Sequence, residues 1–365
     1  MKNHRKFWAV ALTHALVPVV MVLTRADASG DGNPATDIDV FVSGKEGYHT
    51  FRIPSLLVTP KGTLLAFCEG RKTSRSDHGD VDLVLKRSGD GGKTWGPLEL
   101  VYEAGDTAKI TIGNPCPVVD RDTGVIWLPF CRDNRAVFVT HSRDDGKTWA
   151  RPVNITAAVT RPGWSWVATG PGVGIQLAKG NFAGRLVIPC DHKVKAQPGN
   201  AGYHSHIIYS DDHGKTWQLG GAAGPFTNEC QVVELGDSSL MLNMRNYHGD
   251  KDRSRRRAVA FSKDGGQTWS DSRYDDALIE PICQGSLHRH GKSLVFSNPA
   301  STRKRERLTI RLSHDDGKTW PESMLIHEGA AAYSCLATLP DGRIGVLFER
   351  DDYRALTFVA LRDPG

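Results

Sequence analysis

The chain has 365 residues, enough for one large β-barrel or β-propeller or for two smaller domains. Its formal net charge is +5 at pH 7, but the first 28 residues carry four basic side chains and one acidic one, so the remainder carries only +2. This nearly neutral balance argues against the strongly basic surface that nucleic-acid binding requires, and we expect no nucleic-acid partner.

The N-terminus has the pattern of a secretory signal peptide. A basic start precedes a mostly apolar run over residues 7–23, and small residues suit cleavage after Ala28. We therefore predict a signal peptide over residues 1–28, one domain over residues 29–365, and export to the periplasm or the medium. The alternative is a retained membrane anchor, although the apolar run is shorter than the ~20 residues of a spanning helix. We expect no membrane span in the mature chain.

The next informative stretch is Phe51-Arg52-Ile53-Pro54, which an apolar run follows. It places an arginine at the start of a buried strand, where Pro54 is tolerated because the first residues of a strand need not donate to the ladder. Taken alone, such an arginine is either a solvated strand end or a binding group.

One eight-residue pattern, S-x-D-x-G-x-T-W, recurs five times without exception. The copies begin at Ser88, Ser142, Ser210, Ser262 and Ser313. Their Ser and Asp side chains can bond nearby backbone N–H groups, glycine supplies a positive φ, and Thr-Trp resumes a strand with a large apolar anchor. Each copy therefore predicts a hairpin turn, which we call a box turn.

The spacing of the box turns predicts a ring of repeated units. The turns start 54, 68, 52 and 51 residues apart, and short alternating or apolar runs typical of strands lie between them. After the fifth turn only about three strands remain, over residues 333–339, 343–349 and 355–361, and Tyr333 opens the first of them. We therefore expect residues 38–42 to supply the fourth strand of the last unit. The predicted fold is all-β: a six-bladed β-propeller with four-stranded antiparallel blades, closed by the N-terminal strand.

Polar side chains are predicted to gather on the face of the ring opposite the box turns. In an up-and-down meander, that face receives seven of them from four blades: Arg52, Arg71, Asp77, Glu229, Arg245, Arg305 and Tyr333. Several arginines around one depression would bind an anion strongly, and without one they need an acidic neighbour such as Glu349. An Asp in a loop can act as a general acid, and a Tyr beside a Glu as a nucleophile with its base.

At this point the residues resemble the exo-α-sialidases of the bacterial and animal type. Besides the box turns, the matching motifs are Phe51-Arg52-Ile53-Pro54, Glu69-Gly70-Arg71, Ser76-Asp77-His78, Asn228-Glu229-Cys230, Met244-Arg245-Asn246, Ser297-Asn298-Pro299-Ala300 and residues 333–339. The resemblance covers essentially all of the mature chain. It implies a glycoside hydrolase that removes terminal sialic acid from sialylated glycans. We expect no cofactor, no metal and a monomer.

The resemblance also implies roles for the basic residues. Three arginines would hold the carboxylate of sialic acid, namely Arg52, Arg245 and Arg305. Glu349 would steady Arg52, and Arg71 would lie beside the substrate near the acid loop. We assign the third arginine to Arg305, among Arg303, Arg307 and Arg311, because the family's third arginine precedes a Leu-Thr strand start by three residues.

For the chemical steps, the resemblance implies that Asp77 is the general acid/base and that Tyr333 is the nucleophile, assisted by Glu229. Sialic acid carries a carboxylate on its anomeric carbon, so a carboxylate nucleophile would approach against like charge, whereas a neutral tyrosine avoids this. The expected outcome is hydrolysis with retention. Trp164 and Trp166 are either a pocket wall or structural aromatics.

Two other functions fit the same pattern. A glycan-binding propeller without catalysis would keep the box turns, which are structural, but would not need the full set of Arg, Asp, Glu and Tyr. A trans-sialidase, or a glycosidase for a related nine-carbon acid, would keep both fold and site, because loop shapes decide access of water and acceptor.

The cysteines and one basic cluster are two further features of the sequence. Seven cysteines are scattered without any Cys-x-x-Cys pair, so we expect buried free thiols by default and no zinc site. An exported chain also permits disulfides, although an odd number of cysteines leaves at least one thiol unpaired. The cluster at residues 253–257 is expected to be a solvated loop face. Asn154-Ile155-Thr156 fits a glycosylation sequon, which is a weak signal.

Overall fold

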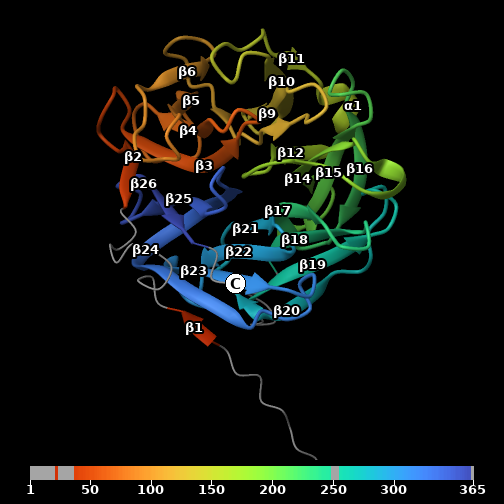
Figure 1. The fold of residues 1–365 in the computed structure, drawn as a ribbon. Coiled ribbons are helices and arrows are strands. Elements are labelled where there is room, and N and C mark those ends of the chain that lie inside the picture. Colours follow the sequence, from red (N-terminus) through yellow and green to blue (C-terminus); the bar gives the residue numbers. More distant parts are fainter. Residues whose placement is uncertain (1–20, 24–36, 248–254, 363–365) are drawn as a thin grey trace, which may run out of the picture.

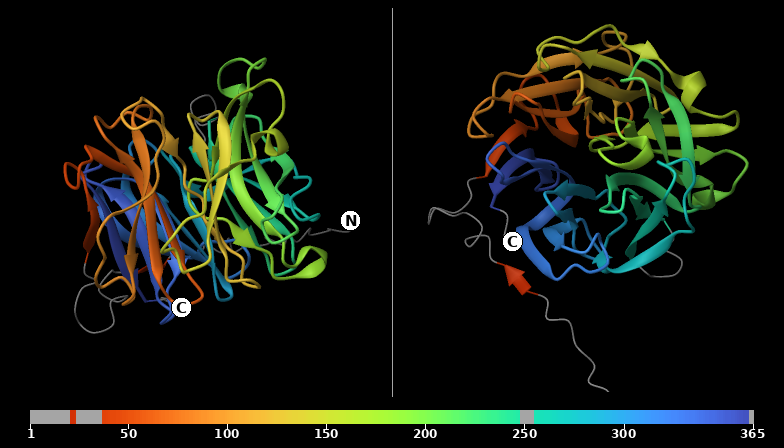
Figure 2. Two further views of the ribbon diagram at one scale, coloured as in Figure 1. Left: turned by 90° about the horizontal axis from the view of Figure 1, so that it is seen from above. Right: turned by 45° about the vertical axis from the view of Figure 1, so that its right-hand side comes forward.

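The computed structural model describes residues 21–23, 37–247 and 255–362. The predicted signal peptide therefore lies almost wholly outside the described residues. Among those that are described, no helix is both long and apolar enough to cross a membrane. The chain forms small β-sheets arranged around a common centre, as in a propeller (Figure 1), and Figure 2 shows the same ring from two other directions.

Two of the sheets are four-stranded antiparallel meanders in which strands pair in chain order. The first contains β3 (Thr50–Val58), β4 (Leu64–Arg71), β5 (Val81–Ser88) and β6 (Glu99–Tyr102). The second contains β17 (Thr227–Glu234), β18 (Leu240–Asn246), β19 (Arg256–Ser262) and β20 (Arg273–Ile279).

Two five-stranded sheets follow the same plan but divide one edge between two short or separate strands. The first contains β7 (Ile112–Gly113), β8 (Val118–Val119), β9 (Ile126–Arg132), β10 (Ala136–Ser142) and β11 (Val153–Asn154). The second contains β12 (Trp164–Thr169), β13 (Ile175–Gln176), β14 (Leu186–Val194), β15 (Tyr203–Ser210) and β16 (Gln218–Ala223). The short helices are α1 (Thr156–Val159) and the 3-10 segments Gly180–Phe182 and Gly199–Gly202.

The remaining sheet has eight strands and joins the two ends of the described chain. Its main path is β2 (Ile38–Val42), β26 (Ala355–Leu361), β25 (Ile344–Arg350), β24 (Glu322–Thr338), β23 (Glu306–Ser313), β22 (Ser293–Pro299) and β21 (Ser286–His290). In addition, β1 (Met21–Leu23) pairs in parallel with β24. Strand β2 pairs antiparallel with β26 and lies beside it in Figure 1.

Strand β24 is longer than the sequence predicts, because it extends on both sides of Tyr333. Its first part pairs with β23 up to Ala330, and its second part pairs with β25 from Ala331 onward. The prediction that Tyr333 opens a separate strand is therefore wrong. The small residues at 329–332 continue as extended backbone between the two partners, so no turn precedes Tyr333.

The box turns have the hydrogen bonds that their sequence predicts. In the first, the Ser88 hydroxyl donates to Asp90 at 2.8 Å and accepts the Gly92 N–H at 2.9 Å. Asp90 also accepts the amide and the hydroxyl of Thr94 at 2.9 and 2.6 Å. The other four turns repeat this set.

The box tryptophans pack across to the neighbouring sheet. The Trp149 ring meets Phe67 of β4 edge-on at 5.6 Å between centroids, and Trp217 meets Trp127 of β9 at 6.4 Å. Trp95 of the first turn packs likewise against Phe358 of β26 at 5.5 Å. The turns therefore connect adjacent sheets as well as reversing the chain.

The expected cysteine state is confirmed, because all seven cysteines are buried with free thiols. The prediction of a solvated loop at residues 253–257 is wrong for Arg257. Its guanidinium is fully buried and donates to Glu280 at 2.7 Å and to the side-chain oxygen of Asn243 at 2.7 Å. Strand β19 begins at Arg256, and the alternation of side chains along it turns Arg257 into the core, where Glu280 neutralises it.

Candidate active site

Arg52 and Glu349 form the support of the site. Glu349 of β25 accepts the Arg52 Nε–H at 2.9 Å and the Ile53 N–H at 3.0 Å on one oxygen. Its other oxygen accepts Arg52 Nη2 at 3.2 Å and the Tyr333 N–H at 3.0 Å. Ile53 has a φ of 62°, rare for a β-branched residue, where the β3 register shifts between Arg52 and Ser55. One buried carboxylate thus fixes Arg52 and the backbone of Tyr333 together.

Tyr333 and Glu229 lie in direct contact on two different sheets. The Tyr333 hydroxyl, on β24, donates to a carboxylate oxygen of Glu229 on β17. Arg245 of β18 donates from Nη1 to the other Glu229 oxygen at 2.7 Å and to the Tyr333 hydroxyl at 3.2 Å. Burial and the negative charge of Glu229 raise the pKa of Tyr333 well above its ordinary value. The phenol is therefore neutral at neutral pH, with a proton acceptor already in contact.

Asp77 lies in the loop after β4, between two arginines. Its carboxylate accepts Arg71 Nη1 at 2.8 Å and Arg52 Nη1 at 3.3 Å, and its side chain is 68% exposed. Partial burial acts to raise the pKa of Asp77, but the positive charges of Arg71 and Arg52 outweigh it and lower the pKa below its ordinary value. Arg71 is itself held by buried Glu69, which accepts two of its N–H groups at 2.7 and 3.1 Å.

Arg305 is placed against Tyr333 just before β23. Its guanidinium carbon lies 5.7 Å from the centre of the Tyr333 ring, and Nη1 donates to the Tyr353 hydroxyl at 3.3 Å. Two of its neighbours in sequence, Arg303 and Arg307, are exposed, and Arg307 pairs with Glu328. Geometry thus brings Arg305, and not these two, to the predicted nucleophile.

Tyr353 is a member of the cluster that sequence reasoning missed. Its ring lies under the Arg52 guanidinium at 4.1 Å, and its hydroxyl bonds Arg305, so it bridges two of the arginines. A signal was available, because the turn between β25 and β26 lies at the same end of the strands as the loop that carries Asp77.

Asp191 is a second missed residue, and it connects both sides of the site. This fully buried carboxyl on β14 accepts Trp166 Nε1 at 2.9 Å and Asn228 Nδ2 at 2.7 Å. The Trp166 ring meets His78 edge-on, next to Asp77 in sequence, while Asn228 precedes Glu229. Burial and the nearby Glu229 charge raise the pKa of Asp191 well above its ordinary value.

The two tryptophans therefore differ in place. Trp166 borders the loop of Asp77, which fits a pocket wall. Trp164 stacks on His192 with ring centres 3.7 Å apart and forms part of a histidine cluster with His206. Burial lowers the pKa of His192 to about 3, so this cluster is uncharged at neutral pH.

One group of side chains has the composition of a metal site. Asp120, Asp122 and His213 have ligand atoms within 4.8 Å of one another. However, the buried Asp120 carboxylate already accepts the His213 ring N–H at 3.0 Å, the Thr123 hydroxyl at 2.6 Å and an amide hydrogen of Gln176 at 3.1 Å. The group lies at the third box turn, away from Tyr333.

The structure brings together all eight residues predicted for the site. They form one connected cluster at the end of the strands opposite the box turns: Arg52, Arg71, Asp77, Glu229, Arg245, Arg305, Tyr333 and Glu349. Such a cluster can bind an anion between its guanidinium groups, can donate a proton from an aspartic acid and can attack with a tyrosine.

Comparison with known proteins gives a consistent result. Residues 62–346 match the family model of the BNR repeat-like domain. The chain is 36% identical to a sialidase of Micromonospora viridifaciens over 93% of this chain and 58% of that protein. It is 30% identical to the mouse protein Sialidase-2 over 86% of this chain and 93% of that one.

A solved structure agrees with these sequence relatives. The Hadza microbial sialidase Hz136 superposes with a TM-score of 0.81 at 31% identity, over 90% of this chain and 68% of that one. The chain spans 58% of the length of its Micromonospora relative, so that protein contains a large part with no counterpart here.

Proposed function

This chain belongs to the sialidase family, and we propose that it is a retaining exo-α-sialidase, a glycoside hydrolase that releases terminal sialic acid from glycoproteins, glycolipids and oligosaccharides. The observation that carries the proposal is the hydrogen bond from Tyr333 to Glu229 within a cluster of arginines. A tyrosine nucleophile is the known exception that sialidases make to the two-carboxylate rule for glycosidases.

In the proposed first step, the Tyr333 oxygen bonds to the anomeric carbon while Glu229 takes the phenolic proton. The bond to the leaving oxygen breaks, and Asp77 protonates that oxygen. Water activated by Asp77 then attacks the glycosyl-tyrosine, and Glu229 returns the proton to Tyr333. Two inversions give net retention. The raised pKa of Tyr333 supports this order, because the phenol stays neutral until the base acts.

The proposed carboxylate clamp consists of Arg52, Arg245 and Arg305. Its support is that the guanidinium carbons of Arg52 and Arg305 lie 5.1 and 5.7 Å from the Tyr333 ring, while Arg245 bonds its hydroxyl. A carboxylate gripped there brings its anomeric carbon to the phenol. Glu349 would hold Arg52 in place.

Asp77 is ionised in the free protein by this geometry, yet a general acid must carry a proton. The bound substrate would provide the change in pKa that this requires. When the substrate carboxylate binds Arg52, it neutralises the charge of that arginine, so only Arg71 still stabilises the ionised form of Asp77. The pKa of Asp77 would then rise. Substrate binding would thus prepare the acid.

We also propose that the ring has six blades. Division of the eight-stranded sheet within β24 gives six blades, the last containing β24, β25, β26 and β2. The pairing of β2 with β26 supports closure of the ring by the N-terminal strand. Small-angle X-ray scattering should give a single compact particle; an elongated two-lobed envelope would contradict the closed ring.

We also propose that residues 1–28 are removed on export and that the mature protein acts as a monomer on sialylated glycans. The sialidase relatives support the substrate class. Mass spectrometry of the exported protein should show an N-terminus at Ser29; a retained Met1 would refute cleavage.

The direct test of the nucleophile is Tyr333→Phe. This change removes one oxygen, and hydrolysis of a fluorogenic sialoside should fall at least about a thousandfold while sialic acid still binds. Tyr274→Phe, an exposed tyrosine on β20, is the matched control and should keep full activity. Unchanged hydrolysis by Tyr333→Phe would reject Tyr333 as nucleophile, and binding without any turnover in the unaltered protein would favour a non-catalytic glycan-binding propeller.

A further inference from the structure

A large cavity of the described structure lies at the other end of the ring from Tyr333. It measures about 810 Å³, within the range of roughly 300–1,000 Å³ that small-molecule sites occupy. The inner strands connect the two ends: β3 carries Arg52 near its start and Val58 at its end, and β17 carries Glu229 and then Glu234. The first pair is six residues apart and the second is five, which is roughly 20 and 17 Å along a strand.

A hydrogen-bonded loop separates this cavity from the candidate active site. The loop 170–172 is held by three buried side chains: Ser55 on β3, Gln231 on β17 and Gln284 in the segment before β21. The Ser55 hydroxyl donates to the Gly172 carbonyl at 2.8 Å, and Gln231 and Gln284 donate to the Pro171 carbonyl at 3.1 and 3.5 Å. The cavity is therefore a second site and not the base of the first.

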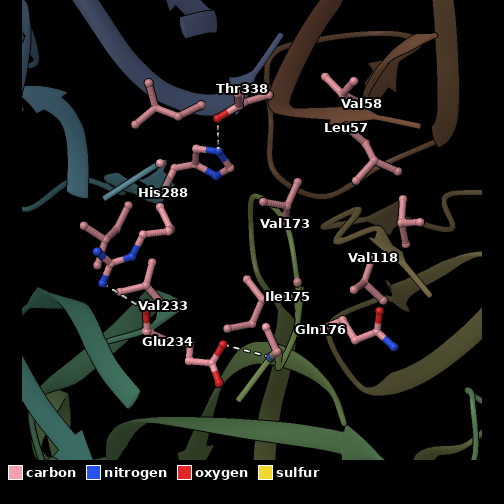
Figure 3. Close-up of a pocket in the computed structure, with 18 of the residues that line it drawn as sticks. Leu57, Val58, Val118, Val173, Ile175, Gln176, Val233, Glu234, His288 and Thr338 are labelled. Atoms are coloured by element: carbon pink, nitrogen blue, oxygen red, sulfur yellow. Dashed lines mark hydrogen bonds between the residues drawn. The ribbon is translucent and has the colours of Figure 1, made fainter. Parts of the chain in front are cut away.

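The walls of the cavity are apolar. Figure 3 shows aliphatic side chains pointing into it from several sheets, among them Leu57, Val58, Val118, Val173, Ile175 and Val233. The imidazole of His288 also faces it and bonds the Thr338 hydroxyl at 3.0 Å. Burial and the neighbouring His290 lower the pKa of His288 to about 4, so this ring adds no charge at neutral pH.

Charged side chains surround the apolar part, and positive charge predominates. The lining includes four cations and two carboxylates: Arg121, Lys179, Arg289, Lys292, Glu234 and Asp316. Both carboxylates are engaged. Glu234 accepts the N–H groups of Ala178 and Lys179 at 2.8 and 2.9 Å, and Asp316 pairs with Arg289 at 2.5 Å.

Arg121 and Lys292 have no carboxylate partner among the described contacts. Arg121 donates to the backbone carbonyls of Gln176 and Leu177, which are neutral acceptors, and Lys292 is exposed. An apolar interior with an excess of cations at its edge is complementary to a molecule with a hydrocarbon body and one anionic group.

We propose that this cavity binds a free single-chain amphiphile with an anionic head group, a medium-chain fatty acid anion in chemical class. The hydrocarbon chain lies among Val173, Ile175 and the aliphatic wall, and the carboxylate faces Arg121 and Lys292. This site is independent of the proposed sialidase activity.

The probe is dodecanoate below its micelle concentration, titrated by isothermal calorimetry. One saturable site per chain is expected. Ile175→Trp, which fills the cavity, should weaken binding at least about tenfold, and Lys292→Glu about threefold, with no effect of the latter on neutral dodecanol. Leu100→Trp, an exposed aliphatic residue on β6 outside the cavity, is the matched control and should bind normally.

Sialoside turnover checks that each variant is folded, since none of these residues contacts the catalytic cluster. No saturable binding to the unaltered protein, or equal binding by Ile175→Trp and Leu100→Trp, would overturn the proposal. Cosedimentation with phosphatidylglycerol vesicles separates a free ligand from an acyl chain still held in a bilayer. If the protein binds vesicles and Ile175→Trp abolishes that binding, the cavity holds a bilayer acyl chain and the proposal of a free ligand is overturned. If vesicle binding is absent, or is the same in Ile175→Trp, the proposal of a free ligand is supported.

Discussion

Asp77 has the lowered pKa of an ion-paired carboxylate, but the proposed mechanism requires it to donate a proton as a general acid. Its role can be tested through the leaving group of the substrate. Proton donation by Asp77 accelerates the reaction more when the leaving group has a high pKa than when it has a low one. A sugar alcohol needs a proton to leave, whereas a phenolate or coumarin of low pKa does not. Substrates with different leaving groups therefore isolate this one role.

Asp77→Asn should lower kcat/KM for sialyllactose by about 10²–10⁴-fold and for an activated aryl sialoside far less. Steady-state kinetics on both substrates measure the ratio. Asp106→Asn, at an exposed loop position, is the control and should leave both rates unchanged. Equal losses on the two substrates would assign Asp77 to binding and not to proton transfer.

Arg305 offers a second test at the residue scale, because an exposed arginine lies two positions away. Arg305→Ala removes a charge beside Tyr333 and should weaken binding of free sialic acid roughly 10–100-fold, the range for hydrogen bonds to a charged group. Arg303→Ala should change it by less than about threefold. Calorimetry compares the two, and an equal or reversed loss would place the third arm of the clamp elsewhere.

The box turn is the element that repeats, and its aspartate makes a prediction about pH. Hydrogen bonds from the Thr94 hydroxyl and amide lower the pKa of Asp90 to about 2, and the aspartates of the other four turns shift in the same direction. A carboxylate with a lowered pKa stabilises the folded state above its unfolded pKa of about 3.9. That stabilisation is lost as the pH falls from about 4 towards 2.

Asp90→Asn should therefore lower the free energy of unfolding at pH 7 by about 1 kcal/mol or less, since Asp90 is exposed. It should also flatten the decline of stability between pH 4 and 2. Urea unfolding at several pH values measures both effects. Asp271→Asn, another exposed aspartate outside the box pattern, serves as control; an identical pH slope in the two variants would mean that the turn geometry does not tune Asp90.

Local patterns explain which parts of these elements were predictable. The box turns follow from residues close together in sequence, so their hydrogen bonds could be predicted one by one. The burial of Arg257 could not be predicted in this way, because it depends on where β19 begins and on Glu280, which lies 23 residues further along the chain. Strand β24 likewise runs through the expected break before Tyr333, since extended alanines and a change of pairing partner leave no turn signal.

At the scale of the whole molecule, the active-site cluster depends on contacts between distant segments. Glu349 meets Arg52 across 297 positions in sequence, and Phe41 of β2 packs against Phe51 at 5.2 Å between ring centres. The family resemblance predicted the first contact from motifs. Tyr353 and Asp191 could not be predicted from local sequence. Tyr353 contacts Arg305 and Asp191 contacts Asn228, and these partners come close only in the assembled ring.

The central claim is that this ring of sheets holds a tyrosine-based retaining sialidase, and proton NMR of the protein acting on α2,3- and α2,6-sialyllactose tests it most directly. A retaining mechanism should release free sialic acid whose first-formed anomer is α, followed by slow mutarotation to β. A first-formed β anomer would contradict the Tyr333 mechanism. A sialylated transfer product or an anhydro sugar in place of free sialic acid would contradict hydrolysis.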